Sequence, residues 1–191
     1  LPLLEQLHNL DTNWIIDPSH SFADDNRMRL QVTFPDLQLN DGRSDIALSL
    51  FLHNSYDGSE GVRMFWGAIR GMCSNGMVFG SVLSKYYRKH TSGLEIKNLK
   101  GSLESTYEKI PVIKHRIEIL QNTNVTKKMR RDVEDHLGKH VIKYVNSQEK
   151  QFKKAANLWV LYNLITYYIS HQVDMRMRAQ YQLDTSRLFK L

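Results

Sequence analysis

The stretch DIALSLFLH, residues 45–53, alternates in a way that decides the fold class. One set of alternate positions is fully apolar: Ile46, Leu48, Leu50 and Leu52. Because successive side chains of a strand point to opposite faces, this stretch predicts a central strand covered at least partly on both faces. The preceding stretch RMRLQVTF, residues 27–34, alternates as cleanly and predicts a half-buried strand. Between them, residues 35–45 contain Pro35 and an Asp41-Gly42 turn signal, which indicate a hairpin connection.

The loop HNSYDGSEG, residues 53–61, has two interpretations. Asp57 and Gly58 lie between two strand-like runs, where an aspartate bonds the local backbone and a glycine takes positive φ, so a hairpin turn is favoured. The same loop would line a site if it met the segments around Cys73 and His90 in space. Residues 62–83 then carry four glycines, which predict short strands or a strand followed by a small helix.

From about residue 95 the apolar residues recur at helical spacing. Pro111 is expected to start or kink a helix, Thr126 is a predicted N-cap, and a last helix is expected from about Gln151 to Gln180. The sequence therefore predicts an α+β fold, with a small antiparallel sheet in the N-terminal half followed by three or four helices. One domain overall is expected, with a mixed sheet region at 1–94 and a helical region at 95–191 packed on it.

Charge is divided unevenly along the 191 residues. Residues 1–60 have a net charge of −7 and residues 61–191 a net charge of +13, within a total of +6. This division indicates either a polyanion or acidic partner for the second part, or an acidic part that folds against the basic one. The longest apolar run is too short and too polar for a membrane span, and Cys73 is the single cysteine. We therefore expect a soluble, cytoplasmic protein.

The motifs for metal and cofactor chemistry are weak. His136 and His140 are four residues apart on a predicted helix, but a solvated face explains them better than a metal site. The glycine-rich stretches match neither phosphate-binding pattern, so no metal and no cofactor are expected. A catalytic alternative gathers His53, Asp57, Cys73 and His90 into one pocket for hydrolysis or nucleotide modification. A non-enzymatic role is favoured over it.

Basic and aromatic residues alternate along the second part of the chain, and this pattern is a stronger indication of function than the motifs above. Cations suit a phosphate backbone, and aromatic faces stack on bases without demanding a sequence, so this combination favours single-stranded nucleic acid. The alternatives are a solvated face for the lysines and burial for the aromatic residues. The candidate contacts are Arg63, Arg70, Lys85, Arg88, Lys89, Lys127, Lys128, Arg130 and Arg131.

Four blocks in order resemble a known family. They are NSYDGSEG at 54–61, IRGMCSNGMVFG at 69–80, KHTSG at 89–93 and LYNLITYYISHQ at 161–172. The chain is similar to the phage- and plasmid-borne proteins known as domain of unknown function 932. The resemblance implies a setting in phage or plasmid DNA metabolism and names no reaction. The positions that match are Asn54, Ser55, Asp57, Gly58, Cys73, Asn75, His90 and Thr91, whereas Tyr56 replaces a histidine common in the family.

The leading hypothesis is a phage- or plasmid-borne protein that binds single-stranded DNA, as an annealing or recombination accessory, and that forms homo-oligomers. The first alternative is the hydrolase or nucleotide-modifying enzyme described above. The second is a non-catalytic assembly or regulatory protein, in which the charge division and the C-terminal helix serve self-association or binding to a host protein.

Overall fold

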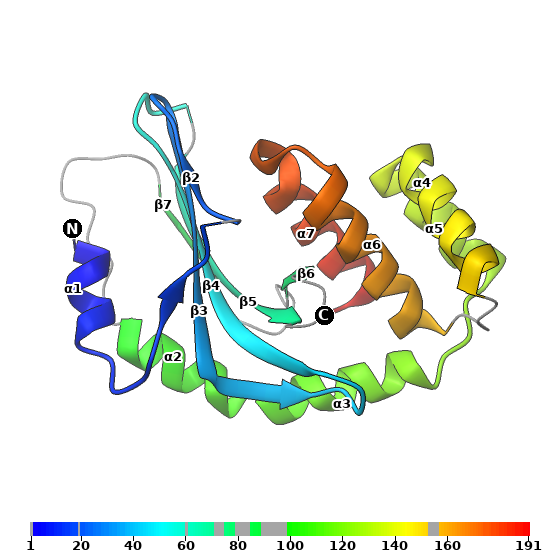
Figure 1. The fold of residues 1–191 in the computed structure, drawn as a ribbon, viewed down its shortest axis with the longest axis horizontal. Coiled ribbons are helices and arrows are strands. Elements are labelled where there is room, and N and C mark those ends of the chain that lie inside the picture. Colours follow the sequence, from blue (N-terminus) through cyan, green and yellow to red (C-terminus); the bar gives the residue numbers. More distant parts are fainter. Residues whose placement is uncertain are drawn as a thin grey trace.

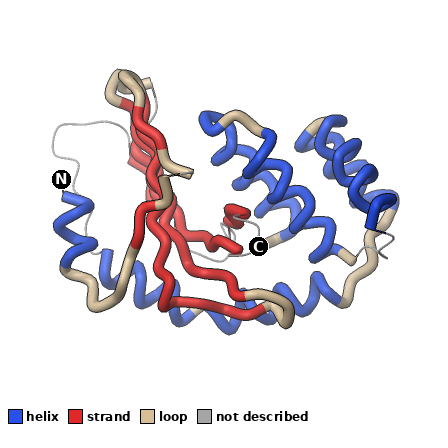
Figure 2. Tube along the Cα trace, in the orientation of Figure 1, coloured by secondary structure: helices blue, strands red, loops and turns tan. Residues whose placement is uncertain are grey.

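Three long antiparallel strands form the centre of the fold. The structure is a computed structural model that describes residues 2–18, 20–59, 61–70, 75–78, 85–88, 99–152 and 157–191. The central strands are β3 (Arg27–Asn40), β4 (Asp45–Ser55) and β5 (Val62–Arg70), paired in that order (Figure 1). Figure 2 shows that this sheet bends, so that its two halves run in different directions.

Short strands cover both edges of the central three. β1 (Ile15–Ile16) and β2 (Phe22–Ala23) pair with β3, whereas β6 (Asn75–Val78) and β7 (Lys85–Arg88) pair with β5. Between β5 and β6 the backbones approach closely at Gly67, where a Cβ would overlap the carbonyl oxygen of Met77. A glycine is therefore required at this position of the strand.

The hairpin between β3 and β4 is tighter than the sequence indicates. Pairing continues to Asn40 opposite Asp45, with an irregular register between Phe34 and Gln38 that accommodates Pro35. Much of the segment expected as a connection is therefore strand, and the turn itself is short. Gly42 in this turn has φ +86°, as the Asp41-Gly42 signal predicts.

Helices precede and follow the sheet. α1 (Pro2–His8) comes first, and the described ranges after the sheet contain α2 (Leu99–Glu108), α3 (Ile110–Gln121), α4 (Lys127–Leu137), α5 (Lys139–Phe152), α6 (Leu158–Gln172) and α7 (Met175–Phe189). The α+β arrangement is confirmed, with the helical half divided more finely than three or four helices. Pro111 lies in the first turn of α3, and Thr126 caps α4 by accepting a hydrogen bond from the backbone N–H of Met129 at 3.1 Å.

The single helix expected from Gln151 to Gln180 is wrong. Val173 is extended, with φ −89° and ψ 138°, and it separates α6 from α7. Asp174 then caps α7 by accepting a hydrogen bond from the backbone N–H of Arg176 at 2.8 Å. An aspartate at this position favours a new helix start over continuation of the old one.

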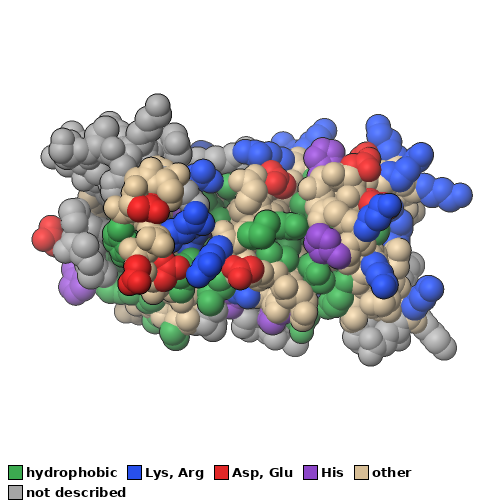
Figure 3. Space-filling view, turned by 90° about the horizontal axis from the view of Figure 1, so that it is seen from above, with side chains coloured by type: hydrophobic (Ala, Val, Ile, Leu, Met, Phe, Trp, Pro, Cys, Tyr) green, Lys and Arg blue, Asp and Glu red, His purple; other side chains and the backbone are tan. Residues whose placement is uncertain are grey.

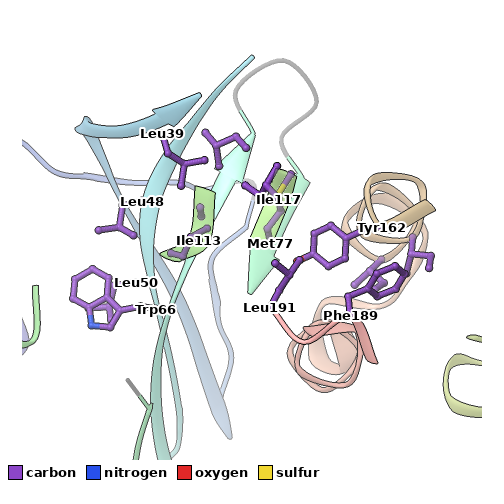
Figure 4. Close-up of a cluster of buried hydrophobic side chains, with 14 of the residues drawn as sticks. Leu39, Leu48, Leu50, Trp66, Met77, Ile113, Ile117, Tyr162, Phe189 and Leu191 are labelled. Carbon is purple, nitrogen blue, oxygen red and sulfur yellow. The ribbon is translucent and has the colours of Figure 1, made fainter. Parts of the chain in front are cut away.

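The sheet lies between two groups of helices. Figure 1 shows α1, α2 and α3 along one side, α6 and α7 on the other, and α4 with α5 beyond them. Trp66 is buried on the α2 side, where its Nε1 donates to Ser102 Oγ at 2.8 Å. Figure 4 shows Leu48 and Leu50 near Trp66, and Tyr162 and Leu191 between β6 and the helices α6 and α7. Most buried apolar side chains of the sheet and the helices form one continuous cluster.

No helix in the described part of the chain combines the length and the apolar composition that crossing a bilayer requires.

Candidate functional site

Part of the second face of the sheet is polar although it is buried. Arg29 on β3 is the direct cross-strand partner of His53 on β4, which in turn is opposite Arg63 on β5. Arg29 and His53 are each only 6% exposed, and Arg63 is half-buried. Directly opposite side chains on one face have Cβ atoms about 5 Å apart, so three basic side chains share a row across the sheet.

Helix α7 covers this row and encloses a small pocket with it. The pocket has a volume of about 30 Å³. We call it the α7 pocket. The residues that line it are His20, Phe22, Arg29, Gln31, Phe51, His53, Met175, Arg178, Ala179 and Gln182. Apolar contact between the sheet and α7 is small here. Its buried residues are Phe51, Phe65 and Val78 of the sheet and Ala179 of α7, and they are separate from the main core. Polar side chains therefore form much of this part of the contact between sheet and helix.

Internal hydrogen bonds fix several walls of the α7 pocket. Gln182 Nε2 donates to the carbonyl oxygen of Gly76 at 3.2 Å, which ties α7 to β6. Arg178 Nε donates to the carbonyl oxygen of Val173 at 2.8 Å, across the break between α6 and α7. On the opposite wall, His20 lies 3.0 Å from Asp17. The pocket is consequently built from side chains held in defined positions.

In the α7 pocket, positive charge belongs to the arginine side chains and not to His53. Burial lowers the pKa of His53 well below its usual value, and the charges of Arg29 and Arg63 lower it further. His53 is therefore neutral at pH 7. Burial also lowers the pKa of Arg178, against the opposing effect of Asp174. The pocket therefore places the guanidinium groups of Arg29 and Arg178 beside a neutral imidazole.

The loop after His53 forms a hairpin turn. Asp57 Oδ1 accepts a hydrogen bond from the backbone N–H of Ser59 at 2.9 Å, and Gly58 has φ +73°. Hydrogen bonds from Ser59 lower the pKa of Asp57, whose side chain is exposed. His53 faces α7, whereas Asp57 bonds within its own turn. Cys73 and His90, the other members of the catalytic alternative, lie outside the described residues.

A second basic surface lies on α4 and α5. Lys127, Lys128 and Arg131 on α4 and Lys139 and Lys143 on α5 are exposed, and we call these five the α4–α5 face. Figure 3 shows Lys and Arg side chains spread over this end of the molecule. Arg130, by contrast, pairs with Glu149 at 2.7 Å and donates to Asn146 Oδ1 at 2.9 Å. It therefore joins α4 to α5.

Partly exposed rings lie next to this basic surface. The rings of Tyr144 on α5 and Tyr167 on α6 are nearly parallel, with centroids 6.4 Å apart and an interplanar angle of 3°. Tyr167 stacks in turn on the exposed His171, with centroids 4.1 Å apart. His140 contacts Tyr168 at 5.7 Å, so it belongs to the same group of rings. Helix α5 thus carries both the ring of Tyr144 and the exposed Lys139 and Lys143.

Arg70 has an internal role. Its guanidinium lies 3.0 Å from Asp41, and it donates to Ser44 Oγ and to Asn163 Oδ1, each at 2.6 Å. Trp159 Nε1 donates to the same Asp41 carboxylate at 2.8 Å. These contacts join the β3–β4 turn to β5 and α6. We therefore leave Arg70 out of the proposed ligand contacts.

The remaining predicted contacts do not form one surface. Lys85 and Arg88 lie on the edge strand β7, and Lys89 lies outside the described residues. Arg63 lies on β5, and Figure 1 shows α6 and α7 between the sheet and α4. His136 approaches the carbonyl oxygen of Asp132 at 2.8 Å, while His140 contacts rings. Among the described residues there is no group of three or more His, Cys, Asp or Glu that could hold a metal ion.

The sequence interpretation missed Arg29 and Arg178. Arg29 occupies the polar side of an alternating strand, which we expected to face solvent, and α7 buries that side. One sequence feature could have indicated this burial. The stretch DIALSLFLH predicts a strand covered on both faces, and Arg29 on the adjacent strand lies on the same face as His53. The ring group of Tyr144, Tyr167 and His171 was also missed, because stacking across two helices depends on how they pack.

A family model described as a domain of unknown function (DUF932) matches residues 12–189. No curated protein and no solved structure matches the chain.

Proposed function

The chain belongs to this family of unknown function, and we propose that it binds single-stranded nucleic acid through the α4–α5 face and the adjoining rings. The observation that carries the proposal is the stacked set Tyr144, Tyr167 and His171, of which Tyr144 shares helix α5 with the exposed Lys139 and Lys143. Lysines attract the phosphate backbone, and ring faces accept unpaired bases by stacking. A single strand offers both groups at once, whereas a duplex hides its base faces.

The arrangement supports binding without sequence preference. Stacking is available to every base and is worth about 1–3 kcal/mol per base, whereas phosphate contacts carry no sequence information. The resemblance to phage- and plasmid-borne proteins supports a setting in mobile-element DNA metabolism, in the cytoplasm. Within that setting we propose an annealing or recombination accessory. Annealing brings two strands together, so self-association of the chain is part of this proposal.

The test is fluorescence anisotropy of a labelled oligothymidine, with a DNA duplex of equal length as the competitor. We expect the single strand to bind more tightly than the duplex at low salt. Lys139→Ala combined with Lys143→Ala should weaken binding at least tenfold at low salt, because each cation lost removes a phosphate contact. Tyr167→Ala should also weaken it, by about 1–3 kcal/mol, through lost stacking.

The matched control is Lys114→Ala combined with Arg116→Ala on α3. Both side chains are exposed, and α3 lies on the other side of the sheet (Figure 1). This control removes the same charge and should leave most of the affinity. Equal losses in the two double variants would show that net charge, rather than the α4–α5 face, determines binding. Light scattering at the concentrations that bind DNA would test self-association.

A further inference from the structure

A wide groove lies between α2, the segment that follows α1, and β3. Its volume is about 570 Å³, within the range of about 300–1,000 Å³ that is typical of binding clefts. The lining contains the side chains of Leu10, Leu37 and Leu103 and the ring of Tyr107, together with three carboxylates and one lysine. We call it the α2 groove, and it combines apolar surface with acidic side chains.

The α2 groove carries negative charge. Asp11 lies 3.6 Å from Lys100, and both side chains are more than half exposed, so the two form a surface ion pair. Glu104 and Glu108 are one turn apart on α2, and both are exposed. Within the described ranges neither glutamate takes part in an ion pair. A partner that fits the groove therefore combines apolar groups with positive charge.

The first turn of α7 presents those groups on the same chain. Met175 and Met177 are 36% and 55% exposed, and Arg176 between them is exposed as well. We call these three residues the α7 tip. Arg176 lies 3.6 Å from Asp24, but its side chain is 63% exposed, and a guanidinium has donors for more than one carboxylate. Methionine and arginine are both enriched in protein–protein interfaces.

The α7 tip and the α2 groove of one copy are on opposite sides of the sheet. Figure 1 shows α2 on one side and α7 on the other, so the sheet separates the two surfaces. A contact between them therefore joins different copies of the chain. Because two different surfaces meet, the contact is head-to-tail, and its repetition produces a ring or an open filament.

We propose that the α2 groove binds the α7 tip of a second copy. The two methionines pack on the leucines and on the ring of Tyr107, to which methionine sulfur is attracted. Arg176 pairs with Glu104 and Glu108 across the contact. This inference rests on the proposed function in one respect, since it specifies the self-association that annealing requires. No nucleic acid takes part in the contact.

Sedimentation velocity of the chain without nucleic acid tests the contact. We expect the mean mass of the wild type to rise with protein concentration. Glu104→Lys combined with Glu108→Lys, and Arg176→Glu combined with Met177→Glu, should each stay monomeric, because like charges then face each other across the contact. Acidic side chains are favourable in the first turn of a helix, so the second double variant keeps α7.

An equimolar mixture of the two double variants is the decisive arm. In the mixture the altered groove faces the altered tip and the original groove faces the original tip, so opposite charges meet in both contacts. Complexes that contain both variants should form, although neither variant associates alone. A folding defect cannot produce this result. A wild type that associates, with a mixture that does not, would contradict the head-to-tail contact.

Arg187→Glu is the matched control on α7, since its side chain is 62% exposed, and it should associate like the wild type. If a double variant loses the circular dichroism of the wild type, Met177→Gln decides. It replaces one exposed side chain and should weaken association about threefold or more, because less apolar area is buried.

Three results overturn the proposal. The first is a wild type that stays monomeric at about 1 mM, which is the weak end of specific association. The second is a double variant that associates as strongly as the wild type, and the third is unchanged association of Met177→Gln. Because the assay contains no DNA, a failure of this contact is distinguished from a failure of single-strand binding.

Discussion

The protonation of a single residue, His53, depends on its surroundings in the fold. The sequence offers it as a base beside a loop, but the sheet and α7 bury it between Arg29 and Arg63. A histidine in that position cannot readily hold a proton. Its value to the protein is as a neutral wall of the α7 pocket, and a role as a general base receives no support from its contacts.

The depressed pKa of His53 predicts an acid-sensitive stability. As pH falls below about 6.5, the unfolded chain takes up a proton that the folded chain excludes, so stability is lost progressively toward the folded pKa. The charged groups that face His53 are Arg29 and Arg63 from the sheet and Arg178 from α7. Urea unfolding from pH 7.5 to 5 should show this loss in the wild type and a smaller one in His53→Gln. His115→Gln, an exposed histidine on α3, is the control, and equal slopes in all three proteins would refute the account.

The stability of the fold is also expected to depend on the charge of Asp41. Burial raises its pKa, but hydrogen bonds from Trp159, Ser44 and the backbone of Arg43, and the charge of Arg70, lower it more. The stability that this carboxylate provides is present above its unfolded pKa of about 3.9 and is lost as pH falls through the lower folded value. Asp41→Asn should destabilise the fold by roughly 2–4 kcal/mol at pH 7, because Arg70 loses its charged partner.

Urea denaturation of Asp41→Asn checks this, with the exposed Asp45→Asn as its control. The control should change the free energy of unfolding by less than about 0.5 kcal/mol. A similarly small change in Asp41→Asn would show that the network of Asp41, Arg70 and Trp159 contributes little.

At the scale of elements, the break between α6 and α7 matters most for the site. Arg178 donates across it to Val173, and α7 covers the polar sheet face only because the chain turns there. Asp174→Ala removes the N-cap and should cost about 1 kcal/mol of stability. Amide exchange in the first turn of α7 should then accelerate. The exposed Asp135→Ala on α4 is the control, and unchanged exchange in α7 would contradict the capping role.

Elements could be predicted where local patterns act alone. The strands around Leu30 and Leu50, the turn at Gly42, the start of α3 at Pro111 and the Thr126 cap follow from alternation, backbone preference and capping. The end of α6 was missed because neither a glycine nor a proline separates it from α7, and the capping aspartate Asp174 was not recognised as a helix start. The α7 pocket could not be predicted, since it requires knowing which helix covers the second face of the sheet.

At the scale of the whole molecule, the charge division has a partial internal explanation. Within the described ranges, three ion pairs link the acidic first part to the basic second part: Asp41 with Arg70, Asp11 with Lys100 and Asp24 with Arg176. Some of the positive charge is therefore balanced by folding. Figure 1 shows α6 and α7 between the sheet and the helices α4 and α5, and the cations of the α4–α5 face are exposed. That surplus is where a polyanion would bind.

The salt dependence of single-strand binding tests this central claim most directly. Each phosphate contact contributes about −0.7 to the slope of log K against log salt concentration for a single strand. The account predicts a clearly negative slope for the wild type, which becomes less negative by about 1.4 in Lys139→Ala, Lys143→Ala and stays close to the wild type in Lys114→Ala, Arg116→Ala. A wild type that does not bind at low salt, or that binds with a slope near zero, would contradict it.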